Sequence, residues 1–79
     1  MSGTVYCHVS TNGTANIRSA PNTSAPVIER LTRSQSVDVI GLSADGGWYA
    51  VRLATQVGWV STAVVREVDP CVNVPPLSP

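Results

Sequence analysis

The chain is 79 residues long, with 43% hydrophobic and only 13% charged residues, so its composition predicts one small globular domain rather than a disordered segment. Five basic residues, all arginine, balance five acidic ones, and this zero net charge excludes binding to DNA or to an anionic membrane by charge alone. No apolar run approaches the roughly 18 residues of a membrane-spanning helix. We therefore expect no nucleic-acid partner and no membrane insertion.

The first predicted strand covers residues 5–10, where apolar and polar side chains alternate. Asn12-Gly13 is typical of a turn, and a three-residue loop at 11–13 would make a hairpin with the next strand. That hairpin would pair the inward-facing residues on one face: Val9 with Ala15, and Cys7 with Ile17. The same register would point Tyr6, Asn16 and Arg18 outward.

The middle of the chain alternates between irregular loops and apolar strands. Residues 19–26 are rich in proline and small polar residues, which predicts an ordered loop, and apolar alternation resumes at 27–31. The longest apolar strand follows at 37–42. The alternation of inward-facing apolar residues shifts by one residue between Val39 and Ile40, just before a glycine. This shift predicts a β-bulge or a sharp bend.

The stretch from residue 46 to residue 60 predicts the central hairpin. With a connection of two or four residues, Tyr49 opposes Val60 and Ala50 opposes Trp59, whereas a three-residue loop would reverse the faces. One face then carries the valines of the core. The other face would hold both indole rings and a guanidinium on a common exposed patch: Trp48, Trp59 and Arg52.

The chain is expected to end in a short strand at 64–68 and a proline-rich segment. Residues 72–79 contain three prolines among the last five positions, which favours an extended linker or tail leading to a longer protein. Residues 1–4 carry no structural signal. We therefore place the domain at residues 5–71, between the N-terminal residues 1–4 and the tail.

The two cysteines, Cys7 and Cys71, lie near the two ends of this domain. The first and last strands of a barrel commonly lie close together, so we expect a disulfide, with two buried free thiols as the alternative. A bridge would close a loop of about 65 residues and stabilise the fold by about 4 kcal/mol. It would also indicate an oxidising compartment, and hence an extracellular or cell-envelope protein.

Four segments resemble, in order and spacing, the successive motifs of bacterial SH3 domains: residues 16–21 (Asn-Ile-Arg-Ser-Ala-Pro), 27–28 (Val-Ile), 47–52 (Gly-Trp-Tyr-Ala-Val-Arg) and 58–61 (Gly-Trp-Val-Ser). The resemblance covers roughly residues 15–65. It implies an all-β, strongly bent SH3-like barrel of about five to seven short antiparallel strands without a substantial helix. It also implies a non-catalytic module of exported or wall-associated proteins, often beside peptidoglycan hydrolases.

The sequence departs from that family pattern in three loops. Ala20 replaces a usual glycine, Ser34 replaces a turn glycine, and residues 54–56 lack the usual Gly or Asn. In comparison with eukaryotic SH3 domains, Trp48 and Trp59 fall at positions of the proline-binding groove. The acidic loop and the tyrosine-rich motif of those domains are missing, so their specificity for arginine-flanked proline peptides does not carry over.

Residues for catalysis are not found in a suitable pattern. Cys7 and His8 are neighbours on a strand, so they point to opposite faces and cannot act as a nucleophile and its base. We expect His8 to be a solvated surface residue. One histidine and two paired cysteines cannot form a four-ligand zinc site. We therefore predict no enzyme activity, no metal and no cofactor.

Six residues are the candidate ligand-binding residues: Trp48, Trp59, Arg18, Arg52, Asn16 and Tyr6. An indole face can stack on a sugar or a proline, while the polar side chains can donate to carbonyls or carboxylates. The alternative is structural: each indole would close one end of the barrel, and the Arg18 guanidinium would lie on Trp59.

Three functions are compatible with these features. The first is a monomeric module that binds a cell-wall glycan or peptide and holds an attached domain at peptidoglycan or a wall polymer. The second is a protein-interaction or spacer module for an extended or proline-containing peptide, with the tail at 76–79 as a possible ligand of its own groove. The third is a minor catalytic role that would need residues from another chain.

Overall fold

The computed structural model describes residues 4–78, which form seven strands and no helix. The strands are β1 (Cys7–Ser10), β2 (Thr14–Arg18), β3 (Val27–Thr32), β4 (Ser36–Leu42), β5 (Trp48–Arg52), β6 (Val57–Ser61) and β7 (Arg66–Glu67). The prediction of an all-β fold is therefore confirmed. Residues 1–3 of the expected N-terminal segment and Pro79 of the expected tail lie outside the described residues.

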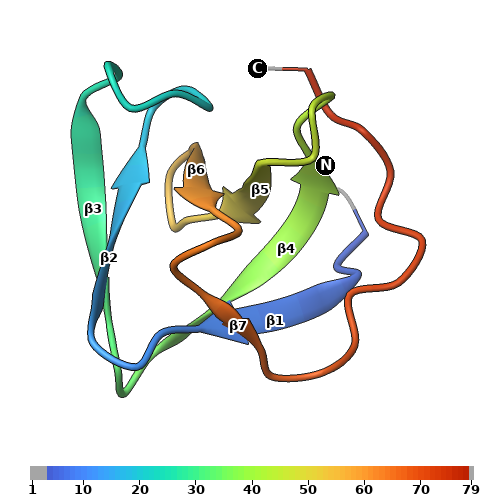
Figure 1. Ribbon diagram of the computed structural model, residues 1–79, viewed down its shortest axis with the longest axis horizontal. Helices are drawn as coiled ribbons and strands as arrows, with labels where there is room; N and C mark the ends of the chain where they lie inside the picture. Colours follow the sequence, from blue (N-terminus) through green and yellow to red (C-terminus); the bar gives the residue numbers. More distant parts are fainter. Residues whose placement is uncertain (1–3, 79) are drawn as a thin grey trace.

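The seven strands form one antiparallel sheet in the order β3-β2-β6-β5-β4-β1-β7, which curls into a small barrel (Figure 1). Alternation along each strand places the larger apolar side chains inside. The buried core contains Cys7, Val9, Ala15, Ile17, Leu31, Val39, Val51 and Val60. None of residues 4–78 belongs to a helix that could cross a membrane.

The predicted hairpin between the first two strands is wrong. β1 pairs with β4 and β7, whereas β2 pairs with β3 and β6, so Val9 lies opposite Val37 and Ala15 lies opposite Leu31. The turn at 12–13 instead carries the chain from one half of the barrel to the other. The expected inward residues are all buried in the same core, because alternation reports which face is inside and not which strand is the neighbour.

Two other predictions of register are confirmed. The central hairpin pairs Tyr49 with Val60 and Ala50 with Trp59 across a four-residue connection at 53–56. The slip in β4 is a bulge, because the register with β5 shifts between Val39 and Gly41. A bulge bends its strand and increases the local twist, and this bend helps the short sheet to curl. The expected last strand at 64–68 is shorter and consists of β7 alone.

The barrel depends on a close approach between β2 and β6. Arg18 pairs with Trp59, and one residue away on each strand the Ile17 side chain packs directly on Gly58. A Cβ at Gly58 would collide with Ile17 and would lie 3.1 Å from the Cδ1 of Leu53. Glycine at this position therefore lets β2 lie against β6, and it fixes where the next residues of β2 point.

We predict that Gly58→Ala destabilises the domain by about 1–3 kcal/mol, because the added methyl group overpacks a core that lacks room for it. Urea unfolding followed by tryptophan fluorescence measures the change. Gly13→Ala is the matched control, since a Cβ there meets nothing within 4 Å. Equal midpoints for the Gly58 variant and the wild type would show that the approach is not tight.

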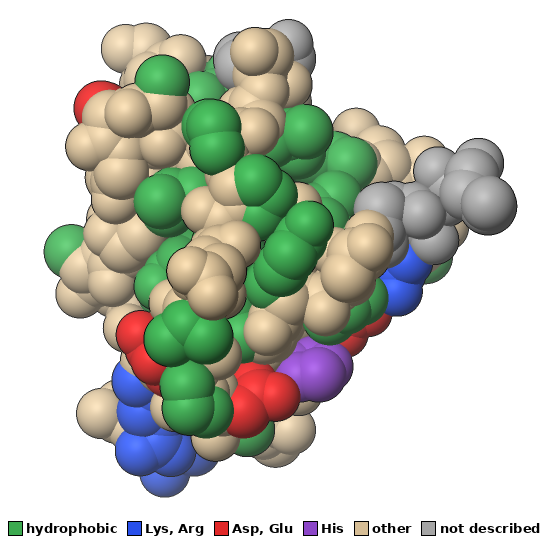
Figure 2. Space-filling model, turned by 90° about the vertical axis from the view of Figure 1, so that its right-hand side faces the viewer, with side chains coloured by type: hydrophobic (Ala, Val, Ile, Leu, Met, Phe, Trp, Pro, Cys, Tyr) green, Lys and Arg blue, Asp and Glu red, His purple; other side chains and the backbone are tan. Residues whose placement is uncertain are grey.

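The segment after Cys71 lies on the barrel, although we expected an extended linker. Pro76 forms a parallel bridge with Leu42, whose N–H donates to the carbonyl of Pro75 at 3.0 Å and whose carbonyl accepts from the N–H of Leu77 at 2.8 Å. The tail follows the right-hand side of the molecule in Figure 1, and hydrophobic side chains gather on that side in Figure 2. The domain limits at 5 and 71 stay a prediction.

Gly41 provides the space for this contact. A Cβ at Gly41 would lie only 2.6 Å from the Cβ of Leu77, so the tail fits against β4 because no side chain stands there. The end of β4 beyond the bulge would otherwise leave backbone groups open on one side. Residues 75–77 cover part of that edge, as an added parallel strand would.

The predicted disulfide joins Cys7 of β1 to Cys71, with 5.1 Å between the Cα atoms and 64 residues between the two positions. The Cys71 N–H also donates to the Glu67 Oε1 at 3.0 Å, which holds the end of β7 beside the bridge. The bridge therefore fixes the start of the tail on the barrel, only four residues before Pro75.

We predict that replacing both cysteines by serine lowers the free energy of unfolding by about 2–5 kcal/mol, because a long loop is released in the unfolded chain. Urea unfolding of the variant and of the oxidised wild type measures this. The reduced wild type should resemble the variant. Equal stability with and without reductant would contradict the prediction.

Candidate functional site

A groove of about 280 Å³ opens beside the indole of Trp48. Three of the six predicted ligand-binding residues line it: Asn16, Arg18 and Trp48. The remaining lining residues are Thr14, Ala15, Thr23, Ser61 and Val64. One aromatic face, one amide, one guanidinium and several hydroxyl groups therefore meet at one place, and we call this hollow the indole groove.

The strand pairing explains why these residues meet. Trp48 begins β5 and lies opposite Ser61 at the end of β6, while β2 crosses the other side of β6 at Arg18. Asn16 is two residues before Arg18 on β2, so both lie on the same side of that strand. The approach of Ile17 to Gly58 therefore brings the polar side of β2 next to the indole.

Arg18 is both a wall of the indole groove and a brace for a loop. Its Nη1 donates to the carbonyl of Ala25 at 2.9 Å, and the N–H of Ser19 donates to the carbonyl of Pro26 at 3.0 Å. These bonds close the loop at 19–26 onto β2. A guanidinium carries five N–H donors, so the bond to Ala25 leaves donors for a ligand.

The turn between β4 and β5 fixes Trp48 through a short polar chain. The Ser43 Oγ donates to the Asp45 Oδ1 at 2.6 Å and accepts from the N–H of Trp48 at 3.0 Å, and the N–H of Gly47 donates to the same Asp45 oxygen at 2.9 Å. Gly46 has a φ of 78°, the left-handed conformation that favours glycine. The Ser43 hydroxyl, and then the Gly47 N–H, lower the pKa of Asp45 from its ordinary 3.8.

We predict that Asp45→Asn removes part of the acid sensitivity of this domain. The folded pKa of Asp45 lies below its unfolded value, so the carboxylate stabilises the fold above that value, and the stabilisation is lost as the pH falls through the folded pKa. Wild type and variant should therefore differ more in unfolding midpoint at about pH 6 than at about pH 2. A difference that is the same at both pH values would contradict the prediction.

The predicted common patch of two exposed indoles is wrong, because Trp59 is buried with 2% of its surface exposed. The predicted strand face was right, because Trp59 opposes Ala50, and Ala50 opposes Gly41. Those three residues share one face of the sheet. Leu77 packs on this face at Gly41, so the tail covers the β4 end of the face. At the β6 end, Arg18 opposes Trp59 and is tied to the loop at 19–26. Trp59 therefore has little surface for a ligand in this structure, and its role as a ligand contact stays a prediction.

Two further candidates, Arg52 and Tyr6, do not line the indole groove. Arg52 lies at the far end of β5, where its Nη2 contacts the Asp38 Oδ2 at 3.0 Å. Tyr6 is 37% exposed just before β1, and its N–H donates to the carbonyl of Val39. Both stay predictions as ligand contacts, but neither joins Trp48 in one site.

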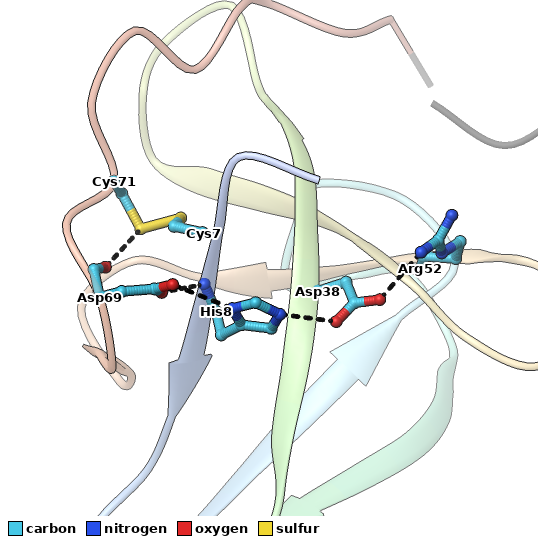
Figure 3. A network of polar contacts seen from close by, with 6 residues as sticks. All are labelled: Cys7, His8, Asp38, Arg52, Asp69 and Cys71. Carbon is cyan, nitrogen blue, oxygen red and sulfur yellow. Dashed lines mark hydrogen bonds and ion pairs between the residues drawn. A yellow bond between two sulfur atoms is a disulfide. The ribbon is translucent and has the colours of Figure 1, made fainter. Parts of the chain in front are cut away.

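Arg52 belongs to a chain of charged groups across four elements (Figure 3). The His8 ring contacts Asp69 through Nδ1 at 3.1 Å and Asp38 through Nε2 at 3.2 Å, and Asp38 contacts Arg52. The His8 backbone N–H bonds to Asp69, and this bond, followed by the ring, lowers the pKa of Asp69. The histidine side chain is 41% exposed, as expected of a surface residue, but it also ties the segment after β7 to β1 and β4.

Some residues of the indole groove were not predicted. Ser61 could have been found, because the predicted register already placed it opposite Trp48. Thr23 and Val64 come from irregular segments whose path depends on tertiary contacts, so alternation gives no signal for them. Among residues 4–78, no group of three His, Cys, Asp or Glu side chains is placed to hold a metal ion.

The fold is thus a small bent β-barrel with an aromatic groove between β2 and the β5–β6 hairpin. The model of the bacterial SH3 domain family matches residues 13–66, and the chain therefore belongs to that family. Its members are binding domains and are generally non-catalytic. A search of curated proteins found no match. The match covers β2 to β6 and reaches into β7, so every residue that lines the indole groove lies within it.

Proposed function

We propose that this chain is the binding module of an exported protein and that it holds an attached domain at peptidoglycan or a wall polymer through the indole groove. One observation carries the proposal: the partly exposed Trp48 lies in the same groove as Asn16 and Arg18. Membership of the bacterial SH3 family supports it, because these domains are often wall-associated.

The chemistry of the groove suits glycan and peptide ligands. The indole offers a flat apolar face for a sugar ring, and the amide of Asn16 and the guanidinium of Arg18 can donate to carbonyls or carboxylates. A volume of about 280 Å³ is slightly below that of usual small-molecule pockets. The groove therefore fits a short part of a longer ligand, as expected for a polymer that continues on both sides.

The disulfide supports export. Bridges such as Cys7–Cys71 form and persist in oxidising compartments and are rare in the cytosol. A stabilising bridge is also typical of small secreted domains, because a core of this size supplies little stability by itself.

A second candidate function is recognition of an extended, proline-containing peptide. The specific observation in its favour is that the barrel already holds such a segment, because residues 75–77 pair with Leu42. No residue of that segment lines the indole groove, so the groove is open to a peptide from another chain.

We predict that Trp48→Ala weakens binding to purified cell walls about tenfold or more, because truncation of a central aromatic contact typically costs more than 1.4 kcal/mol. Sedimentation of the oxidised domain with purified walls measures the bound fraction. Val72→Ala, an exposed tail position outside the groove, is the control. Saturable wall binding that the Trp48 variant retains would exclude the indole groove, and no wall binding by the wild type would leave peptide recognition as the function.

A further inference from the structure

A second hollow, of about 400 Å³, lies at another place on the barrel, and we propose that it binds a phosphate group. It is lined by Thr11 and Asn12 of the β1–β2 turn, by Arg33 of the β3–β4 turn and by Arg66 of β7. We call it the arginine cleft. In Figure 2, arginine side chains gather at the lower end of the molecule, where Figure 1 shows the β1–β2 and β3–β4 turns.

The two arginines of this cleft have no partner within residues 4–78. Arg18 donates to a backbone carbonyl and Arg52 pairs with Asp38, but no hydrogen bond or ion pair involves the guanidinium of Arg33 or Arg66 among the described residues. Two like charges on one hollow repel each other unless a counter-charge lies between them. An anion in the cleft would supply that counter-charge.

Four of the five acidic residues are engaged elsewhere, and the fifth, Glu29, is exposed on β3 and does not line the cleft. Glu67, next to Arg66, accepts the N–H of Cys71, and Asp38 and Asp69 face His8. Asp45 bonds within the β4–β5 turn, and no acidic residue lines the cleft. The module has zero net charge, yet this part of its surface carries two positive charges without a neutralising carboxylate.

The backbone around the cleft is held in place before any ligand arrives. Arg66 pairs with Ser10, and the turn that carries Arg33 is closed by Gln35, whose N–H donates to the Thr32 carbonyl at 3.0 Å and whose Oε1 accepts from the Thr32 N–H at 3.1 Å. On the third side, the Thr11 hydroxyl donates to the carbonyl of Val64 at 3.0 Å. Only the arginine side chains and the Asn12 amide must become ordered on binding, which lowers the cost of association.

The donor set favours phosphate over a single carboxylate. Each guanidinium can donate two parallel hydrogen bonds to one oxyanion, and the Asn12 amide adds further N–H donors. A phosphate presents more acceptor oxygens than a carboxylate and, as a dianion, balances two guanidinium charges. The shared chemistry is the phosphate group, whether it is a free ion, a monoester or a diester of a larger ligand.

The arginine cleft is separate from the indole groove, and the two hollows share no lining residue. They are neighbours, because Thr11 of the cleft bonds to Val64 of the groove. The proposal goes beyond the proposed function, since a phosphate site stands on Arg33 and Arg66 whatever the indole groove binds.

The test is a titration of the oxidised full chain with inorganic phosphate at constant ionic strength, followed by NMR of the arginine side-chain Nε–H groups and the backbone amides. We expect saturable shifts at Asn12, Arg33 and Arg66. Arg33→Gln and Arg66→Gln should each raise the dissociation constant about tenfold, the loss typical of a charge-assisted contact. Arg30→Gln is the matched control, because Arg30 is an exposed arginine on β3 outside the cleft.

Separate titrations distinguish the sources of the phosphate. Saturation by methyl phosphate alone would support a monoester ligand, and saturation by dimethyl phosphate as well would support a diester. Acetate that binds as tightly as phosphate would overturn the assignment. Shifts that stay linear with phosphate, or that Arg30→Gln reduces as much as Arg33→Gln does, would also overturn it, because they would show general charge screening.

Discussion

The contact between Ile17 and Gly58 is the constraint on which the rest of this small barrel depends. The absence of a side chain at Gly58 lets β2 approach β6 closely enough to pair at Arg18 and Trp59. That approach buries Trp59 and brings the polar side of β2 to Trp48. The core and the indole groove are thus two results of one close packing contact, because the same strand contributes its apolar side to one and its polar side to the other.

The two tryptophans differ in solvent exposure because they occupy different positions along their strands. They lie on the same face of the central hairpin, but Trp59 is in the middle of β6, where it has β5 on one side and Arg18 of β2 on the other. Trp48 is at the start of β5, where the sheet ends and a turn begins. A residue at the end of a strand has fewer neighbours to cover it, so the indole of Trp48 stays partly exposed.

Much of the fold could be predicted from the sequence, because local patterns specify local structure. The register of the central hairpin and the bulge in β4 were both predicted from the expectation that Val39, Val51 and Val60 face the core. The partner strand of β1 could not be predicted. Val9 would face the core whether β1 paired with β2 or with β4, so alternation does not distinguish the two pairings. Long-range pairing depends on the whole sheet, and no local pattern contains that information.

The candidate site was predicted in part for the same reason. Asn16, Arg18 and Trp48 line one groove, as expected, because local alternation along β2 and β5 turns all three side chains outward. The burial of Trp59 was not predicted, because segments distant in sequence lie on its face: Arg18 pairs with Trp59, and Leu77, 18 positions further along the chain, packs at Gly41. The face of a strand on which a residue lies follows from local alternation, whereas its accessibility is decided by segments that are distant in sequence.

The bridge between Cys7 and Cys71 also determines how the domain would bear mechanical tension. A pulling force on the two ends of the chain passes from one sulfur to the other, so it never loads the strands between them. The force would act first on contacts outside the bridged loop, which are the two hydrogen bonds between residues 75–77 and Leu42 and the bond from the Tyr6 N–H to the Val39 carbonyl. Stretching would therefore peel the tail from β4 and uncover Gly41, while the covalently closed loop from residue 7 to residue 71 keeps its length.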